Sequence, residues 1–272
     1  MRNSTDTPSF PRYPRHGGAR HAISAAALCG VLLAVATACG EPGAKPRSGG
    51  AAGNGNPAVS GSSRPATVSG SSRPATVGGV PGVGERMGRQ IPDDTRQLVV
   101  VYGDDRDSAE GTAVLYEKLG AEWKQSASWP SHNGRRGWTT DHRLDDERSP
   151  VGVFSLTDAG GTLRSPGTRL PYWYDDHAYA ASVVDPDDEA HAHDFDHVIA
   201  INYNRLRGTP PYDWSRPEGV EKGGGIWLHL DHGDGTSACV TVPESGIKTL
   251  LGTLDPADHP MVVMGDRDRL DD

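Results

Sequence analysis

Short apolar runs separated by turn-forming residues recur along the chain from about residue 94 onward. They cover residues 97–102, 112–117, 122–126, 151–156, 197–203, 226–230, 238–242 and 261–264. Runs of this length, bounded by Gly, Pro, Asp and Asn, are typical of β-strands. One segment favours a helix: Ile247, Leu250, Leu251 and Leu254 follow helical spacing after Pro243-Glu244-Ser245. The pattern predicts a mainly β domain over residues 94–272.

The first 38 residues follow a different pattern. Arginines precede an apolar run from Ala22 to Ala36, and the small residues around Ala38 are suited to cleavage. We interpret residues 1–38 as an export signal. Cys39 follows at once, as in a lipoprotein signal, so we expect Cys39 to be lipidated. An uncleaved membrane anchor is the alternative, but the run is shorter than the roughly 20 residues that a span needs.

Between the signal and the domain, residues 39–93 are rich in Gly, Ser, Pro and Ala. The nine-residue sequence VSGSSRPAT occurs twice in tandem, at 59–67 and 68–76. Such a segment has too little apolar surface to offset its chain entropy. We therefore predict a flexible linker over residues 39–93 that holds the domain away from the membrane.

The charge and the cysteine content limit the classes of function that this chain can have. Removing residues 1–38 takes away four arginines and one aspartate, which changes the formal charge from -9 to -12. Nucleic acid is not an expected partner, because an acidic surface repels phosphate and no basic stripe is present. Of three cysteines, Cys29 lies in the signal and Cys39 at its end, so Cys239 is the sole thiol of the domain. No nucleotide-binding loop or organic cofactor motif is visible.

The segment from Gly223 to Pro243 concentrates the residues that a thiol acyl-transfer site needs. A nucleophilic thiol such as Cys239 requires a neighbouring imidazole that takes its proton and holds the thiolate as an ion pair. His229 lies on a predicted strand and His232 in the following turn, and we favour His229 because a strand is the stiffer support. The Gly233-Asp234-Gly235 turn predicts that the two strands meet as a hairpin.

Small residues before the nucleophile suggest an oxyanion site. The backbone amides of Ser237, Ala238 and Cys239 could donate to a tetrahedral intermediate, since small side chains let a substrate carbonyl approach. A simple tight turn would give the same sequence.

Histidines and aspartates cluster at residues 191–197. Imidazoles two residues apart on an extended segment share a face, so a metal site deserves consideration. A solvated acidic loop over residues 185–196 explains the same residues, and nothing else in the sequence supplies a matching further ligand. We therefore predict no metal.

The sequence resembles the L,D-transpeptidase catalytic domain (YkuD-like) family. The resemblance is carried by His229 through Cys239, by the preceding Gly-Gly-Gly-Ile-Trp-Leu, and by Arg148-Ser-Pro-Val-Gly-Val-Phe-Ser-Leu156. The family motif Ser/Thr-His-Gly-Cys corresponds here to Thr236-Ser237-Ala238-Cys239, so the second histidine and the glycine are replaced. The resemblance implies a mixed β-sheet sandwich with a catalytic cleft and one or two short helices.

For function, the resemblance implies an acyltransferase of the cell envelope. Cys239 would form a thioester with the third residue of a peptidoglycan stem peptide, releasing D-alanine, and an amine of a neighbouring stem would complete a 3-3 cross-link, with His229 moving protons. Family members also react with carbapenems through this thiol. An L,D-carboxypeptidase or other cysteine hydrolase would use water instead, and a non-catalytic wall-binding domain is a third possibility. We expect a monomer, either tethered to the outer face of the cytoplasmic membrane through Cys39 or secreted.

Overall fold

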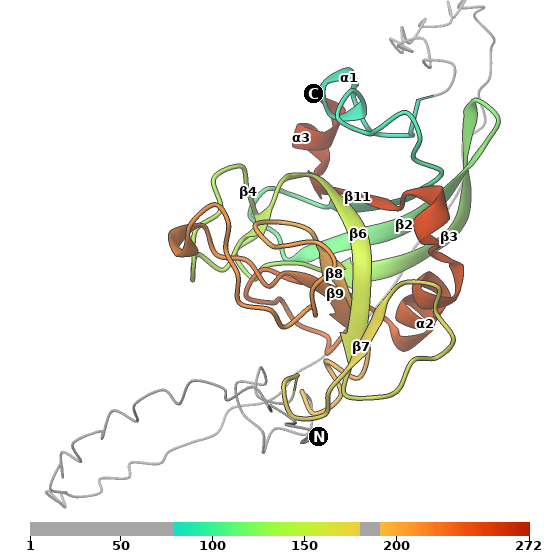
Figure 1. Cartoon of the computed structure of the whole chain (residues 1–272). Coiled ribbons are helices and arrows are strands. Elements are labelled where there is room, and N and C mark those ends of the chain that lie inside the picture. Colours follow the sequence, from blue (N-terminus) through green and yellow to red (C-terminus); the bar gives the residue numbers. More distant parts are fainter. Residues whose placement is uncertain (1–78, 180–190) are drawn as a thin grey trace, which may run out of the picture. The chain divides into compact units, whose positions relative to one another are not determined.

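The computed structural model describes residues 79–179 and 191–272, which are coloured along the chain in Figure 1. The predicted export signal, Cys39 and residues 39–78 of the predicted linker lie outside the described residues. Within these two ranges, no helix has the length and apolar character to cross a membrane.

Strands make up most of the regular secondary structure in this part of the chain. In the described ranges they are β1 (Gln97–Gly103), β2 (Glu110–Leu119), β3 (Glu122–His132), β4 (Trp138–Thr139), β5 (Ser149–Pro150), β6 (Gly152–Gly161), β7 (Tyr172–Tyr174), β8 (Val198–Ile201), β9 (Trp227–Leu230), β10 (Val240–Val242) and β11 (Met261–Asp266). The helices there are α1 (Glu85–Gly88), α2 (Glu244–Thr253) and α3 (Arg267–Asp271), with 3-10 turns η2 (Val220–Lys222) and η3 (Pro256–Asp258). All eight predicted strands are present, and a mainly β fold with short helices is confirmed.

Nine of these strands pair into one mixed sheet that closes on itself, and β4 and β5 pair with each other in a separate two-stranded sheet. The order of the larger sheet is β11-β1-β2-β3-β10-β9-β8-β6-β7, and β11 also pairs with β6. Strand pairs β1–β11, β9–β10 and β6–β7 are parallel, whereas the other pairs of this sheet are antiparallel. The resemblance implied a sandwich, but the β6–β11 pairing joins the strands into one closed sheet instead. Figure 1 shows β6 passing in front of β8 and β9.

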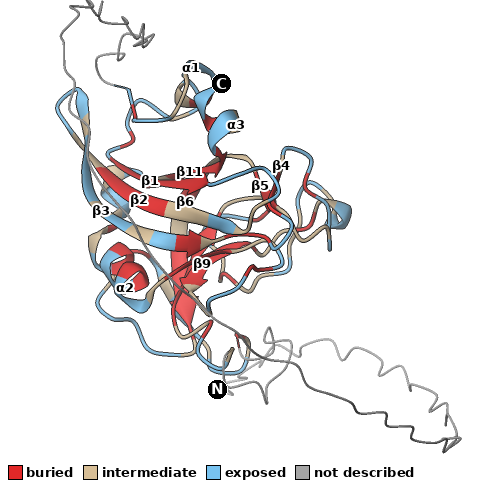
Figure 2. Ribbon diagram, turned by 180° about the vertical axis from the view of Figure 1, so that it is seen from behind, coloured by how far each residue is buried: buried red, intermediate tan, exposed pale blue. Residues whose placement is uncertain are grey.

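Strand β1 shows why this sheet forms. Its seven residues are all buried, because β2 and β11 flank it and both of its faces are covered. Val99 and Val101 enter one apolar cluster with residues of β6, β8, β9 and α2, whereas Leu98 and Val100 enter a second cluster with residues of α1 and α3. This two-residue alternation is the geometry of a strand. Figure 2 shows the resulting buried band through the sheet.

Helix α2 confirms the one helix that the sequence predicted. Ile247, Leu250 and Leu251 are buried in the first cluster, while Lys248 and Glu244 form an exposed ion pair one turn apart. The helical spacing therefore selects one apolar face that covers the sheet.

The predicted linker extends too far along the chain. Val80 and Met87 are only 7% and 3% exposed, and they pack in the second cluster with Leu270 of α3. The N–H of Gly84 also donates to the carbonyl of Leu270 at 2.6 Å. Residues 79–93 therefore belong to the folded domain, because their few apolar side chains complete its core.

Strands β9 and β10 do not form the predicted hairpin. They pair in parallel, with His229 opposite Thr241. The chain between them runs outward to another segment: Thr236 donates its N–H to the carbonyl of Asn133 at 2.9 Å, and Arg135 donates to the carbonyl of Thr236 at 2.8 Å. This excursion lets the chain return to the starting end of β9 before β10 begins.

Candidate active site

Cys239 and His229 lie on neighbouring parallel strands. His229 is in β9, and Cys239 comes directly before β10, where Thr241 is the register partner of His229. Because side chains alternate along a strand, Cys239 and His229 point to the same face of the sheet. One strand spacing and two residues separate them, which corresponds to about 8 Å between their Cα atoms. On the opposite face of β9, Leu228 packs in the first apolar cluster.

A cavity of about 790 Å³ lies over this face of the sheet. Cys239, His229 and Ser237 line it, together with Asp194 and Arg216 from two loops. The sequence-predicted nucleophile and base are therefore brought to one cavity. Their roles stay predictions.

The His229 imidazole is held in a fixed orientation. It is 2% exposed, its Nδ1 lies 2.9 Å from the carbonyl oxygen of Leu230, and its ring centre lies 5.0 Å from that of Phe195. Since only a protonated nitrogen can donate to a carbonyl, the Nδ1–H bond leaves the Nε2 lone pair available to accept a proton. Burial lowers the pKa of His229 to about 4, so the neutral ring predominates at neutral pH.

The Cys239 thiol lies in an apolar environment. Its residue packs against a buried cluster that contains Tyr179, Val198 and Trp227, and the N–H of Trp227 donates to Sγ at 3.4 Å. Burial raises the pKa of the thiol to about 11. Among the described residues, no hydrogen bond joins Sγ to His229. The pKa shifts of both groups favour a neutral thiol and a neutral imidazole at rest, whereas the sequence predicted a thiolate–imidazolium pair.

Alkylation of Cys239 is expected to test this neutral state. With a pKa of about 11, the thiolate fraction rises about tenfold for each pH unit between roughly pH 7 and 10, and the iodoacetamide rate should rise with it. Mass spectrometry of the peptide that carries Cys239 measures this rate. In the chain unfolded by urea, the rate should level off above the ordinary thiol pKa of about 8.5. A plateau beginning near neutrality in the folded chain would contradict the neutral pair.

The two predicted oxyanion residues, Ser237 and Ala238, lie in different environments. Ser237 is exposed and lines the cavity, whereas Ala238 packs against the main core and its carbonyl accepts a hydrogen bond from Ser149 Oγ at 2.7 Å. The hydroxyl of Thr236 donates to the carbonyl of Cys239 at 2.7 Å and closes the turn. This turn keeps the backbone before Cys239 beside the cavity. Donation from the amides of Ser237 and Ala238 to an oxyanion stays a prediction.

A group of polar residues that the sequence did not link to the thiol also borders the cavity. Asp194 is 6% exposed, and its Oδ2 lies 2.9 Å from Nδ1 of His191 and 3.1 Å from Nδ1 of His232. The Asp194 carboxylate raises the pKa of His232. Residues 191–196 were expected to form part of a solvated acidic loop. That expectation is wrong for Asp194, because its backbone carbonyl accepts from the N–H of Leu230 in β9 and its side chain, 8% exposed, lies against His191 and His232.

Arg216 supplies a cation to the cavity. Its Nη1 donates to the carbonyls of Asp213 and Ser215 at 3.0 and 2.8 Å, and in the described part of the chain no carboxylate lies within ion-pair distance of it. Burial lowers its pKa. A Cβ at Gly224, whose φ is 134°, would lie 2.6 Å from Arg216 Nε. Glycine is therefore needed at position 224, both for the backbone angle and for the space that the guanidinium occupies.

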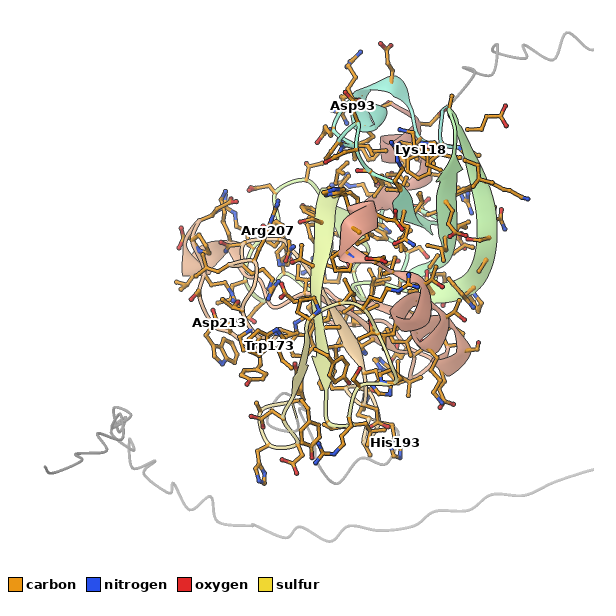
Figure 3. All side chains as sticks on the ribbon, turned by 45° about the vertical axis from the view of Figure 1, so that its right-hand side comes forward. Asp93, Lys118, Trp173, His193, Arg207 and Asp213 are labelled. Carbon is orange, nitrogen blue, oxygen red and sulfur yellow. The ribbon has the colours of Figure 1, made fainter. Side chains whose placement is uncertain are left out.

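The loop that carries Arg216 is anchored by a buried ion pair. Arg205 Nη1 donates to Asp158 Oδ2 at 3.0 Å, and both side chains are 1% exposed. Arg205 Nη2 also donates to the carbonyl of Thr209 at 2.7 Å. These bonds fix the segment between β8 and β9, in which Figure 3 labels Arg207 and Asp213. Because this loop is held through Arg205 by Asp158, which lies far from Arg216 in sequence, no local sequence pattern predicts the position of Arg216.

Comparisons with known proteins leave the family open. No family model matches the chain, and no curated protein matches it. Among solved structures, the chain is similar to Bdellovibrio bacteriovorus Bd1075, with 18% sequence identity and a TM-score of 0.36 over 63% of this chain and 48% of that protein. The chain thus spans about half the length of Bd1075. A likeness at this TM-score supports no statement about function, and membership of the L,D-transpeptidase family stays a prediction.

Proposed function

We propose that this chain is an L,D-transpeptidase that acts on peptidoglycan stem peptides, and that its closed mixed sheet is a form of the YkuD-like fold. One observation carries the proposal: Cys239 and His229 share one sheet face and line one cavity, with the free Nε2 of the imidazole available as a base. The cavity volume, about 790 Å³, suits a short peptide.

In the first half of the reaction, Sγ of Cys239 attacks the carbonyl carbon of the third residue of a donor stem. The Sγ proton passes to Nε2 of His229 as the S–C bond forms. The tetrahedral intermediate then collapses, the C–N bond to D-alanine breaks, and His229 returns the proton to the departing amine. The products are a thioester on Cys239 and free D-alanine. Because the thiol is neutral at rest, proton transfer accompanies attack instead of preceding it.

In the second half, the side-chain amine of the third residue of a neighbouring stem attacks the thioester. His229 takes a proton from this amine, an amide bond forms, the C–S bond breaks, and the proton goes back to sulfur. Asp194 raises the pKa of His229 through its negative charge, so it stabilises the imidazolium that forms in each half. The product is a 3-3 cross-link and the enzyme is regenerated.

The donor offers a carboxylate to Arg216. A tetrapeptide stem ends in D-alanine, whose carboxylate lies one residue beyond the carbon that Sγ attacks. Arg216 is the kind of group that binds such an anion, since its guanidinium borders the cavity and its described hydrogen-bond partners are backbone carbonyls. We infer that Arg216 holds the leaving group.

Replacing Arg216 by glutamine is expected to slow acylation by a tetrapeptide donor roughly tenfold to hundredfold, the loss typical of one charge-assisted hydrogen bond. Single-turnover mass spectrometry measures the rate. Iodoacetamide has no carboxylate, so its reaction with Cys239 should change little. Arg207→Gln is the matched control, because Arg207 belongs to the same loop but is exposed and does not line the cavity. Equal losses in both variants would rule out a specific contact.

The test of the function is incubation of the full chain with a tetrapeptide stem and with an acceptor stem. Mass spectrometry should show an acyl adduct on Cys239 that has lost D-alanine, followed by a cross-linked dimer of stems. A tripeptide product without a dimer would identify an L,D-carboxypeptidase. No adduct from either a stem donor or a carbapenem would favour a wall-binding domain. We further propose that the domain works in the cell envelope, exported by residues 1–38 and tethered through Cys39.

A further inference from the structure

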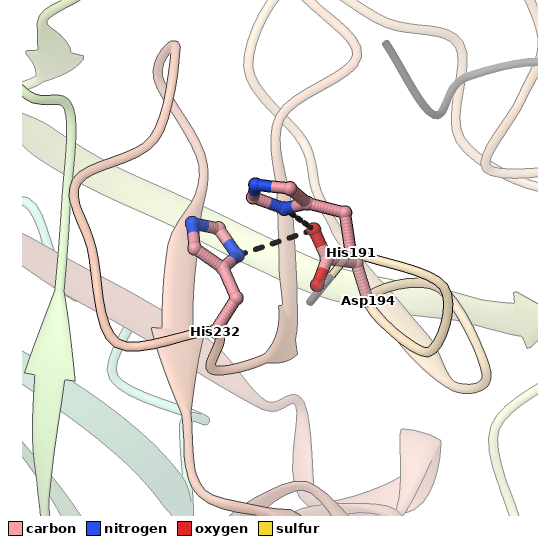
Figure 4. A group of neighbouring side chains, drawn as sticks. All are labelled: His191, Asp194 and His232. Carbon is pink, nitrogen blue, oxygen red and sulfur yellow. Dashed lines mark hydrogen bonds and ion pairs between the residues drawn. The ribbon is translucent and has the colours of Figure 1, made fainter. Parts of the chain in front are cut away.

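Three side chains from two distant segments converge at the edge of the cavity. His191 and Asp194 precede β8, and His232 lies in the turn after β9 (Figure 4). Nδ1 of His191 and Nδ1 of His232 approach the same carboxylate oxygen of Asp194, at 2.9 and 3.1 Å. The two imidazole rings are 4.4 Å apart between centres. One potential ligand atom from each of the three residues lies within 4.8 Å of the other two.

The two separations from Asp194 to the histidine nitrogens suit a tetrahedral zinc ion. Zinc binds imidazole nitrogen at about 2.0–2.1 Å and carboxylate oxygen at about 2.0–2.2 Å, so neighbouring ligand atoms lie about 3.3 Å apart. The two measured separations differ from this value by only a few tenths of an ångström. Two imidazoles and one carboxylate also form a typical zinc ligand set in proteins, with a fourth position left for water. Here that position would face the cavity, which all three residues line.

A second feature independently points to a ligand. The Nδ1 atom of His232 is buried, and its described partner is the Asp194 carboxylate oxygen at 3.1 Å, an ion pair that lacks the alignment of a full hydrogen bond. The His232 side chain is 7% exposed and that of Asp194 is 8% exposed. A buried ring nitrogen without an aligned hydrogen-bond partner is unfavourable in a folded protein. Coordination to a metal ion would satisfy this nitrogen and balance the charge of the buried carboxylate.

We propose that His191, Asp194 and His232 bind one zinc ion. The acyl-transfer chemistry does not require this ion, and a cation bound to Asp194 would offset the negative charge that supports the His229 imidazolium, so bound zinc should slow acylation. The ion would join the segment before β8 to the turn after β9. It would also fix His232, whose ring stacks on that of His229 with 6.1 Å between centres. The sequence pattern at 191–197 gave no reason to include His232, which lies far along the chain.

The neighbouring pair of His193 and Asp196 offers a matched comparison. Nδ1 of His193 lies 3.0 Å from Oδ2 of Asp196, with the same three-residue spacing. However, the His193 side chain, labelled in Figure 3, is 72% exposed, and neither His193 nor Asp196 lines the cavity. Among the described residues no second histidine joins this pair in a potential metal site. The His193 pair should therefore bind no zinc.

Equilibrium dialysis with zinc chloride tests the proposal. The full chain is used with Cys29, Cys39 and Cys239 replaced by alanine, so that no thiol competes and the result is independent of catalysis. After treatment with a chelator, the protein should take up one zinc per chain, measured by mass spectrometry of the metal, and its melting temperature should rise. His191→Ala should weaken binding by at least roughly tenfold, whereas His193→Ala should leave it unchanged.

Two outcomes would overturn the site. One is the absence of stoichiometric zinc uptake by the parent chain. The other is an equal loss of binding in His191→Ala and His193→Ala, which would indicate general chelation by surface histidines. His191 is the main test position because its side chain is 38% exposed, so its truncation should leave the fold intact. His232→Gln provides a second variant, and its circular dichroism spectrum reports whether it is folded.

Discussion

Cys239→Ala is expected to abolish formation of an acyl adduct with a tetrapeptide donor while the domain stays folded. The proposed reaction needs a sulfur atom at this position, and within residues 79–179 and 191–272 Cys239 is the only cysteine. Mass spectrometry of the intact chain should show the adduct for the wild type and none for the variant. The free energy of unfolding should fall by about 1 kcal/mol or less, because the variant loses one sulfur atom and one weak hydrogen bond from Trp227.

Cys239→Ser is the matched control for volume and polarity. A serine hydroxyl ionises far less readily than a thiol, and no aligned base contacts position 239 in the resting structure, so this variant should also form no adduct. Melting temperature and near-ultraviolet circular dichroism verify the fold of both variants. Persistent acylation of Cys239→Ala would place the nucleophile elsewhere, for example at Ser237, which lines the same cavity.

The sequence predicted the strands well where local patterns carry the fold. β1 and β11 are apolar runs bounded by turn residues, and their burial between neighbours requires that composition. Strands that lack a hydrophobic periodicity were not predicted. β7 is a Tyr-Trp-Tyr run with largely exposed residues, and β4 and β5 have two residues each, so neither hydrophobic alternation nor length distinguishes them from loops.

The predictions of the N-terminal domain boundary and of the β9–β10 hairpin were wrong for a common reason. Residues 79–93 contain few apolar side chains, and their burial depends on α3 at the other end of the chain. The Gly233-Asp234-Gly235 turn favours a hairpin locally, but backbone bonds to Asn133 and Arg135 draw the chain outward. Both outcomes depend on contacts between residues far apart in sequence. Composition and spacing do not report such contacts.

The residues of the candidate site also fall into two groups, those that the sequence could place and those that it could not. Cys239 and His229 could be placed together because each lies at the end of a predicted strand and two-residue alternation sets its face. Asp194, His232 and Arg216 come from loops instead. The Arg205–Asp158 ion pair, for example, anchors the loop of Arg216, and no local pattern connects residues 158 and 216. These polar residues that border the cavity could therefore be identified only from the structure.

His229→Ala is expected to slow acylation by about 10²–10⁴-fold, the range typical for loss of a general base. The buried imidazole lines the cavity, and its Nδ1 bond to Leu230 leaves the Nε2 lone pair available; the high pKa of Cys239, about 11, leaves little thiolate to react without this base. The effect should therefore be largest near neutral pH. It should shrink as the pH rises toward 10, because hydroxide then supplies the thiolate. Single-turnover acylation rates between roughly pH 6 and 10 measure this dependence.

Two further variants separate a base from a structural residue. His229→Asn keeps a side-chain N–H that can donate to the Leu230 carbonyl but cannot accept the thiol proton, so it should be as slow as His229→Ala while retaining more stability. His232→Ala should have a smaller effect, because His232 lies in a turn and faces Asp194. If His232→Ala caused the larger loss and His229→Asn acylated normally, His232 would be the base. The parallel pairing of His229 with Thr241, two residues beyond Cys239, would then have no catalytic role.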